Sequence, residues 1–114
     1  MAVNRRRGEV AAIIDGQERT LCLTLGALAE LEDSFAADNL ADLAARFGAG
    51  RLSARDLIRI LAAGLRGAGE TASESEVAAM RIEDGAAGAA RVAAELLTAA
   101  FGAPEESRET AANP

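Results

Sequence analysis

The chain of 114 residues contains no histidine, lysine, tryptophan or tyrosine, and its one cysteine is Cys22. Histidine is the usual proton shuttle and the commonest metal ligand, and lysine forms Schiff bases, so these chemistries lack their usual side chains. One cysteine excludes an internal disulfide, which is typical of a reducing compartment. Because Cys22 lies between two leucines with no histidine to activate it, we expect a small buried hydrophobic residue. These absences argue against an enzyme and for a chain that packs and binds.

The hydrophobic content is high but almost entirely aliphatic. Hydrophobic residues make up 50% of the chain and aromatic residues only 3%. The core must therefore consist of Leu, Ile, Val and Ala, with Phe35, Phe47 and Phe101 as its only rings. Because alanine has the highest helix propensity, the composition favours a mostly helical fold. The length suits one domain with a core of its own.

The formal net charge is −6, and all twelve basic residues are arginine. Nucleic acids attract clustered cations, so an acidic chain without lysine is a poor nucleic-acid binder. The most apolar region, residues 85–102, is interrupted by Arg91 and Glu95 and does not reach the ~20 uncharged residues of a membrane span. No targeting segment is evident. We therefore expect neither nucleic acid nor a membrane as partner, and a cytoplasmic location.

Residues 9–24 have the pattern of a β-hairpin. Apolar residues alternate on both sides of Asp15-Gly16, a dipeptide that is a strong signal for a tight turn between two strands. An isolated hairpin is marginal in water, so one of its faces must rest on helices. Its strand edges are then available to a strand of a partner.

Five helices are predicted from apolar spacing and from residues that begin and end helices. Thr24 is a candidate N-cap of the first helix, and Asp38 or Asn39 of the second. Ser53 with Asp56, and Ser73 with Glu76, have the spacing of capping boxes. The predicted ranges are about 25–36, 40–47, 54–66, 74–81 and 86–101.

The two ends of the chain lack the pattern of packed elements. Residues 1–8 include a run of three arginines, and residues 103–114 are small, polar and charged. We expect a flexible N-terminus and a disordered tail around a single globular domain of residues 9–102. The predicted fold class is α+β, mostly α, with an N-terminal β-hairpin packed on a bundle of about four to five short helices.

No motif indicates catalysis, a metal or a cofactor, and we expect none of these. The glycines of residues 64–69 suggest a phosphate loop, but they follow a helix and lack the required lysine, so a helix end and turn explain them better. Paired acids such as Glu30 and Asp33 are typical of a solvated helix face.

Arg51, Arg55, Arg59 and Arg66 form a row at roughly helical spacing. One interpretation is a solvated face that pairs with local acids. The other is a surface that docks onto an acidic partner, because arginine is enriched in interfaces.

Three stretches in order behind the hairpin carry a resemblance to a known family: residues 23–35 (LTLGALAELEDSF), 50–57 (GRLSARDL) and 60–69 (ILAAGLRGAG). They resemble the small tail protein family encoded in the gene transfer agents of alphaproteobacteria and in related prophages. That family is grouped with phage tail assembly chaperones and is also labelled a tail tube protein. The resemblance covers roughly residues 4–102 and implies no catalytic residues.

The resemblance implies a bacterial cytoplasmic protein that helps to build a phage-like tail. Tail assembly chaperones of this kind are thought to keep the long tape-measure protein soluble while tube subunits polymerise around it. The first hypothesis is therefore a non-enzymatic chaperone that binds the tape-measure protein or other tail proteins. The alternatives are a structural tube or tail-associated component of the particle, and a small regulatory domain that binds an acidic protein through its arginines. A homo-oligomer is a further option.

The residues predicted to bind the partner combine apolar positions, assigned to the core or to a groove, with two arginines at its rim. They are Leu28, Leu31, Phe35, Arg55, Leu57, Arg59, Leu61 and Leu65.

Overall fold

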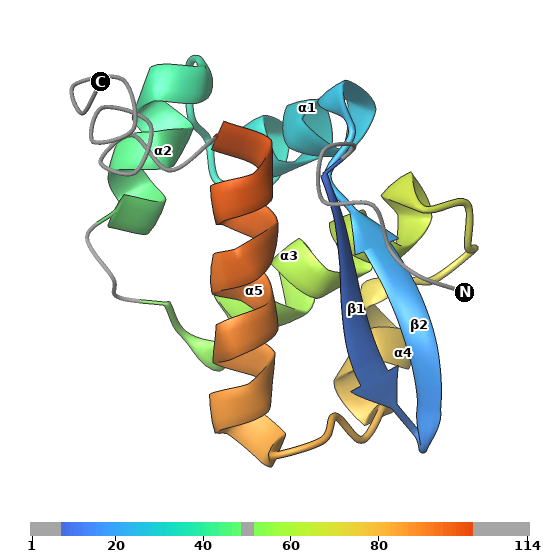
Figure 1. Ribbon diagram of the computed structural model, residues 1–114. Helices are drawn as coiled ribbons and strands as arrows, with labels where there is room; N and C mark the ends of the chain where they lie inside the picture. The colour runs from blue at the N-terminus through green and yellow to red at the C-terminus, as the bar shows by residue number, and fades with distance from the viewer. Residues whose placement is uncertain (1–7, 49–51, 102–114) are drawn as a thin grey trace, which may run out of the picture.

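The computed structural model describes residues 8–48 and 52–101. The predicted disordered tail, the predicted flexible N-terminus up to residue 7, and Arg51 lie outside the described residues. The elements follow in the order β1 (Glu9–Ile14), β2 (Gln17–Cys22), α1 (Leu25–Ser34), α2 (Leu40–Gly48), α3 (Ala54–Gly67), α4 (Glu74–Ala79) and α5 (Gly85–Phe101). The predicted fold class is confirmed: an N-terminal antiparallel hairpin packs on five helices (Figure 1).

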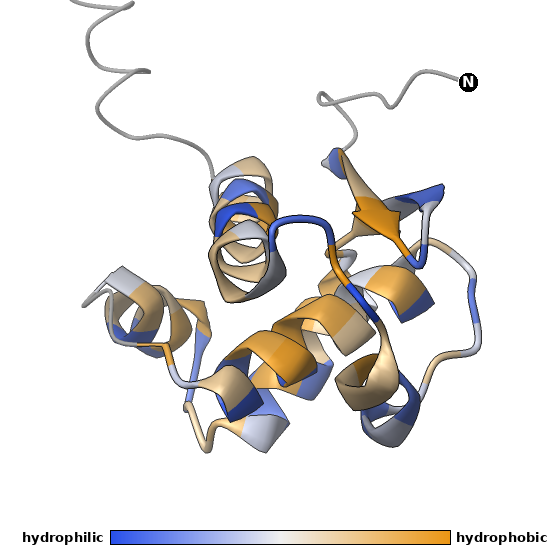
Figure 2. Ribbon diagram, turned by 90° about the horizontal axis from the view of Figure 1, so that it is seen from below, coloured by the Kyte–Doolittle hydropathy of each residue, from blue (hydrophilic) through white to orange (hydrophobic). Residues whose placement is uncertain are grey.

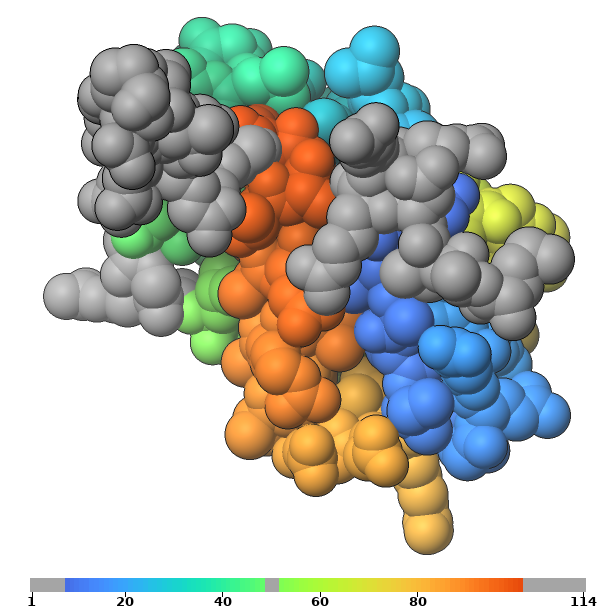
Figure 3. Space-filling model, in the orientation of Figure 1, coloured from blue at the N-terminus to red at the C-terminus, as the bar shows by residue number. Residues whose placement is uncertain are grey.

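The helix α3 crosses the middle of the molecule and contacts β2, α1, α4 and α5. In the view from below, its ribbon shows hydrophobic stretches interrupted by hydrophilic ones (Figure 2). The hairpin and α5 lie side by side on one face of the molecule, where β1 contacts α5 (Figure 3). The helix α2 packs on α1, at one end of the fold. Because α3 contacts so many elements, the side chains of its buried face hold most of the fold together.

The turn of the hairpin has the geometry that the Asp-Gly sequence predicts. Asp15 and Gly16 have φ angles of 53° and 80°, the left-handed conformation that a two-residue hairpin turn requires. The register places Ile14 opposite Gln17 and Val10 opposite Leu21. Alternate residues of β1 are buried, so one face of the hairpin rests on α3 and α5 as expected.

A second segment fastens the tip of the hairpin, and the sequence did not predict it. Residues 81–83, between α4 and α5, run antiparallel to the end of β1, where Ile82 pairs with Ile14. The amide of Asp15 donates to the carbonyl of Arg81 at 2.7 Å, and the amide of Glu83 donates to the carbonyl of Ile13 at 3.0 Å. These bonds occupy part of the outer edge of β1.

Side-chain caps begin four of the helices, largely where the sequence predicts them. The hydroxyl of Thr24 accepts the amide of Ala27 at 3.1 Å at the start of α1, and Asn39 rather than Asp38 caps α2 by accepting the amide of Asp42 at 2.9 Å. Both predicted capping boxes are formed, at α3 and at α4.

Two helices end earlier than the sequence predicts. The helix α1 stops at Ser34 instead of about residue 36, because Ala36 adopts a left-handed conformation with φ 55°. The helix α4 stops at Ala79 instead of about residue 81, because Met80 is extended and leads into the pairing of Ile82 with the hairpin. At α4 a tertiary pairing therefore ends the helix, whereas α1 is closed locally, where the amide of Ala37 donates to the carbonyl of Glu32 at 2.8 Å.

The core is aliphatic, as the composition predicts. Phe35 and Phe47 lie within it, whereas Phe101 is partly buried against it. Cys22 is half-buried rather than fully buried. None of the described helices combines the length and the apolar character needed to cross a membrane. The largest fully buried side chains belong to Val10, Ile14, Leu21, Leu31, Leu43, Ile60, Leu65 and Leu96.

Candidate functional site

The eight residues predicted to bind a partner separate into core and surface positions. The core holds Leu28, Leu31, Phe35, Leu61 and Leu65. Leu57 and Arg59 are half-buried, and Arg55 is exposed. The structure therefore resolves the choice between core and groove in favour of the core for most of the apolar positions. The side chains that remain at least partly accessible to a partner are those of Arg55, Arg59 and Leu57.

The arginines share one side of α3 because of their spacing. Arg55 and Arg59 are four residues apart, and Arg66 follows seven residues after Arg59, so all three project from the same face of the helix. The opposite face carries residues such as Ile60 and Leu61, which are buried in the core. Burial of the apolar face therefore directs the arginine row toward α1 and solvent.

Arg66 is fully engaged within the molecule. Its Nε and Nη2 atoms donate to Oε1 of Glu30 on α1 at 3.1 and 2.6 Å. Its Nη1 atom donates to the carbonyl of Ala72 at 2.6 Å. This one guanidinium thus links α3 to α1 and to the segment before α4, and its charge is neutralised by the ion pair with Glu30.

Arg59 lies next to the ring of Phe35, which ends α1. Its guanidinium carbon is 5.3 Å from the ring centroid, and its Nη1 atom donates to the carbonyl of Ser34 at 3.4 Å. Arg46 of α2 approaches the same ring at 5.0 Å. The ring of Phe47 meets that of Phe35 edge-on, with centroids 5.2 Å apart. Phe35 therefore joins α1, α2 and α3.

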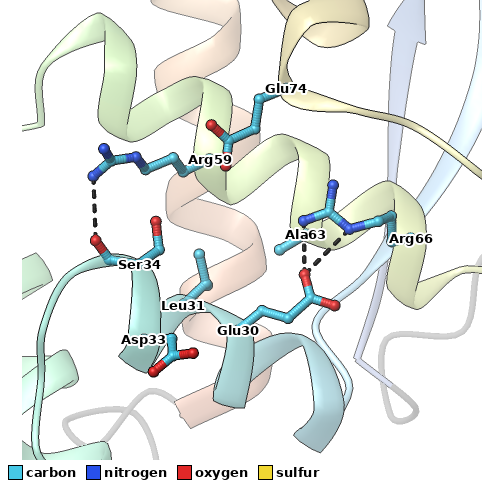
Figure 4. Close-up of a pocket in the computed structure, with 8 residues that line it drawn as sticks. All are labelled: Glu30, Leu31, Asp33, Ser34, Arg59, Ala63, Arg66 and Glu74. Carbon is cyan, nitrogen blue, oxygen red and sulfur yellow. Dashed lines mark hydrogen bonds and ion pairs between the residues drawn. The ribbon is translucent and has the colours of Figure 1, made fainter.

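A groove of about 370 Å³ lies between α1, α3 and the start of α4. Figure 4 shows its lining residues, with the Arg66–Glu30 pair on one side and Arg59 reaching toward Ser34 on the other. Two of the lining carboxylates, Asp33 and Glu74, form no ion pair within the described residues. The lining residues are Glu30, Leu31, Asp33, Ser34, Arg59, Ala63, Arg66 and Glu74.

The groove can form ion pairs and hydrogen bonds with a partner. Its apolar residues Leu31 and Ala63 are almost completely covered, and its groups are carboxylates, guanidiniums and a serine at the surface. No group of three or more metal-ligating side chains occurs in residues 8–48 and 52–101. Such a mixed-charge groove suits the polar side chains of another polypeptide.

Neither Arg46 nor the role of Phe35 as the common contact of two arginines was predicted from the sequence. Arg46 belongs to α2, and only the packing of α2 on α1 brings it to the row on α3. The only signal in the sequence was the pair Arg46-Phe47 at the end of an amphipathic helix. The amphipathic pattern shows which face of α2 is buried, but not which element that face packs against.

Comparison with known families gives one match. The family model described as phage tail tube protein, GTA-gp10, matches residues 7–103. Neither the curated proteins nor the solved structures contain a match.

Proposed function

The chain belongs to the phage tail tube protein family described as GTA-gp10, and from this membership we propose that it acts as a tail assembly chaperone that binds the tape-measure protein. The family is a structural family of phage-type tails, not a family of enzymes. Other tail proteins are therefore the partners that membership suggests. Family membership alone does not distinguish a chaperone from a tube subunit. We propose the chaperone role from the polar character of the accessible surface.

The observation that supports a chaperone is the polar character of the accessible surface. Among the described residues, the large hydrophobic side chains that are exposed are Leu25, at 79%, and Leu40, at 41%. Permanent subunit interfaces are hydrophobic, whereas transient interfaces are more polar. A groove lined by acids and arginines suits a partner that must be bound during assembly and then released.

Co-expression with the tape-measure protein of the same gene cluster tests this role. We expect the soluble fraction of the tape-measure protein to rise when this chain is present, and the two to co-purify. Unchanged solubility together with no co-purification would contradict the proposal. The double variant Glu30→Arg, Arg66→Glu reverses the ion pair of the groove; because it also removes the bond from Arg66 to the carbonyl of Ala72, circular dichroism must first verify that it folds.

A retained component of the tail is the second candidate, and the family description as a tube protein favours it. Quantitative mass spectrometry of purified particles separates the two roles. A tube component is expected in many copies per particle, in multiples of the ring size. A chaperone is expected in the assembling cell and nearly absent from the finished particle.

A further inference from the structure

We infer that Arg46, Arg55 and Arg59, named here the arginine patch, form a receptor for carboxylate side chains in an acidic segment of the partner polypeptide. The inference rests on the proposed function, since it names the chemistry of the segment that a tail partner presents. It concerns the open end of the arginine row, where α2 meets the start of α3, and not the end that Arg66 closes.

The packing of α2 on α1 assembles the patch. Arg46 and Arg59 both approach the ring of Phe35, at 5.0 and 5.3 Å from its centroid, and Arg55 lies one turn before Arg59 on the same face of α3. A guanidinium that stacks on an aromatic ring keeps a defined plane while its N–H groups remain accessible. Two of the three cations are therefore held in place before a partner arrives.

The N–H donors of the patch are largely unused. A guanidinium carries five donors in a fork that matches a carboxylate. Arg46 approaches Oδ1 of Asp56 at 3.7 Å, which is too long for a hydrogen bond. Arg59 makes one long bond of 3.4 Å, and Arg55 has no side-chain partner within the described residues. Arg66, in contrast, makes two bonds of 2.6 Å.

Local electrostatics make an acidic occupant the favoured one. Arg55 lies in the first turn of α3, where the helix dipole disfavours a positive charge. The acid beside it, Asp56, is only 6% exposed and accepts the amide of Ser53 as part of the capping box. Asp56 offsets part of the charge of Arg46, whereas Arg55 has no ion pair within the described residues. An incoming carboxylate relieves the repulsion among the arginines and completes their hydrogen bonds.

The arginine side-chain signals of the full chain provide a direct readout, because the chain contains no lysine and only twelve arginines. We expect a peptide of about ten glutamates to shift the Nε–Hε resonances of Arg46, Arg55 and Arg59, and raising NaCl from about 50 to about 300 mM to reverse the shifts. The resonances of Arg81 and Arg91 report non-specific attraction. Equal shifts at all exposed arginines would overturn the inference.

Co-purification with the tape-measure protein then separates the inference from the proposed function. Arg55→Glu removes no side-chain hydrogen bond or ion pair within the described residues, so the variant is expected to fold, as circular dichroism verifies, and to capture at least about tenfold less partner. Arg81→Glu is the matched control and should capture as much as the wild type. If the wild type captures the tape-measure protein and Arg55→Glu captures it equally well, the function holds and the inference fails. If the wild type captures none, the function fails, and the peptide titration alone decides the inference.

Two further experiments test whether the arginine patch binds nucleic acid or the chain's own C-terminal segment instead. A DNA duplex that shifts the same three resonances more strongly than the glutamate peptide would overturn the inference in favour of nucleic acid. Residues 102–114 contain Glu105, Glu106 and Glu109. A chain that lacks these residues should capture the partner like the wild type; a several-fold gain would assign the patch to the chain's own C-terminal segment instead.

Discussion

The backbone of α3 approaches the hairpin closely at Gly67. A Cβ atom at this position would lie 1.9 Å from the carbonyl oxygen of Cys22. At Gly64, one turn earlier, it would lie 3.0 Å from Leu96 and 3.2 Å from Leu21. In the sequence these glycines resemble a helix end, and Gly67 is indeed the last residue of α3. The packing adds a second reason: a side chain would push β2 away from the central helix.

Gly67→Ala is therefore expected to destabilise the protein by about 1–3 kcal/mol, the usual cost of overpacking a rigid contact. The backbone of Cys22 is bonded in the hairpin and moves less readily than a side chain. Urea denaturation followed by circular dichroism measures the change. Gly48→Ala is the matched control, because a Cβ at Gly48 meets nothing within 4 Å and alanine favours the helix by up to about 1 kcal/mol. Equal stability of the two variants would contradict the close approach.

Asp15 combines a left-handed backbone with a bond to a distant segment. Its φ is 53°, and its Oδ1 atom accepts the amide of Arg81 at 2.9 Å. Asp15→Ala is expected to cost roughly 1–2 kcal/mol, because alanine disfavours this conformation and the acceptor is lost. Asp15→Asn keeps an acceptor and tolerates the conformation, so its melting temperature should stay near that of the wild type. A similar loss in both variants would show that the negative charge matters, not the geometry.

At the scale of elements, helix boundaries show what local sequence determines. The two capping boxes form as predicted, since they depend on residues that are neighbours in the chain. In each case the residue before the N-cap and the fourth helical residue are apolar, which is the pattern of a hydrophobic staple. At α4 these are Ala72 and Val77, both buried. The apolar pattern predicts both C-terminal ends a few residues too late: α1 ends at a left-handed alanine, which the sequence does not signal, and α4 ends where the chain turns to pair with the hairpin.

The same capping substitution is expected to have different consequences in the two helices. Ser53→Ala and Ser73→Ala each remove an acceptor at 3.1 Å from a helix amide, a loss of about 1 kcal/mol. Because α3 is central, Ser53→Ala should lower the global free energy of unfolding. Ser73→Ala should mainly speed amide exchange within the short α4. Ser75→Ala, at an exposed position inside α4, is the control and should lower neither stability nor protection, because alanine favours the helix.

At the scale of the molecule, the sequence predicts the elements and their buried faces better than their contacts. The apolar stripes of the helices identify the core because burial is a property of each helix separately. The pairing of Ile82 with Ile14 and the contact of Arg46 with Phe35 join segments that are far apart in the chain. No spacing rule reaches across such separations. The candidate site was therefore predicted in part: Arg55 and Arg59 are at the surface, but α2 completes the patch.

The arrangement of the helices predicts that α2 opens before the rest of the fold. It packs on α1 through Phe47 and Phe35, whereas α3 contacts most other elements. Leu65→Ala, on the buried face of α3, should lower the free energy of global unfolding by about 2–5 kcal/mol and reduce amide protection in the hairpin as well as in the helices. Phe47→Ala removes a larger side chain, yet it should reduce protection mainly within α2, because detaching one end helix leaves the other contacts intact.

Native-state hydrogen exchange resolved by residue distinguishes these outcomes, and the arginine patch supplies an independent check. If α2 detaches locally, Phe47→Ala should also weaken the shift that the glutamate peptide produces at Arg46, while the hairpin amides remain as protected as in the wild type. Loss of protection throughout the molecule in Phe47→Ala would mean that α2 and α3 unfold as one cooperative unit. The arginine patch would then be as stable as the core, and local opening of α2 would not limit binding at Arg46.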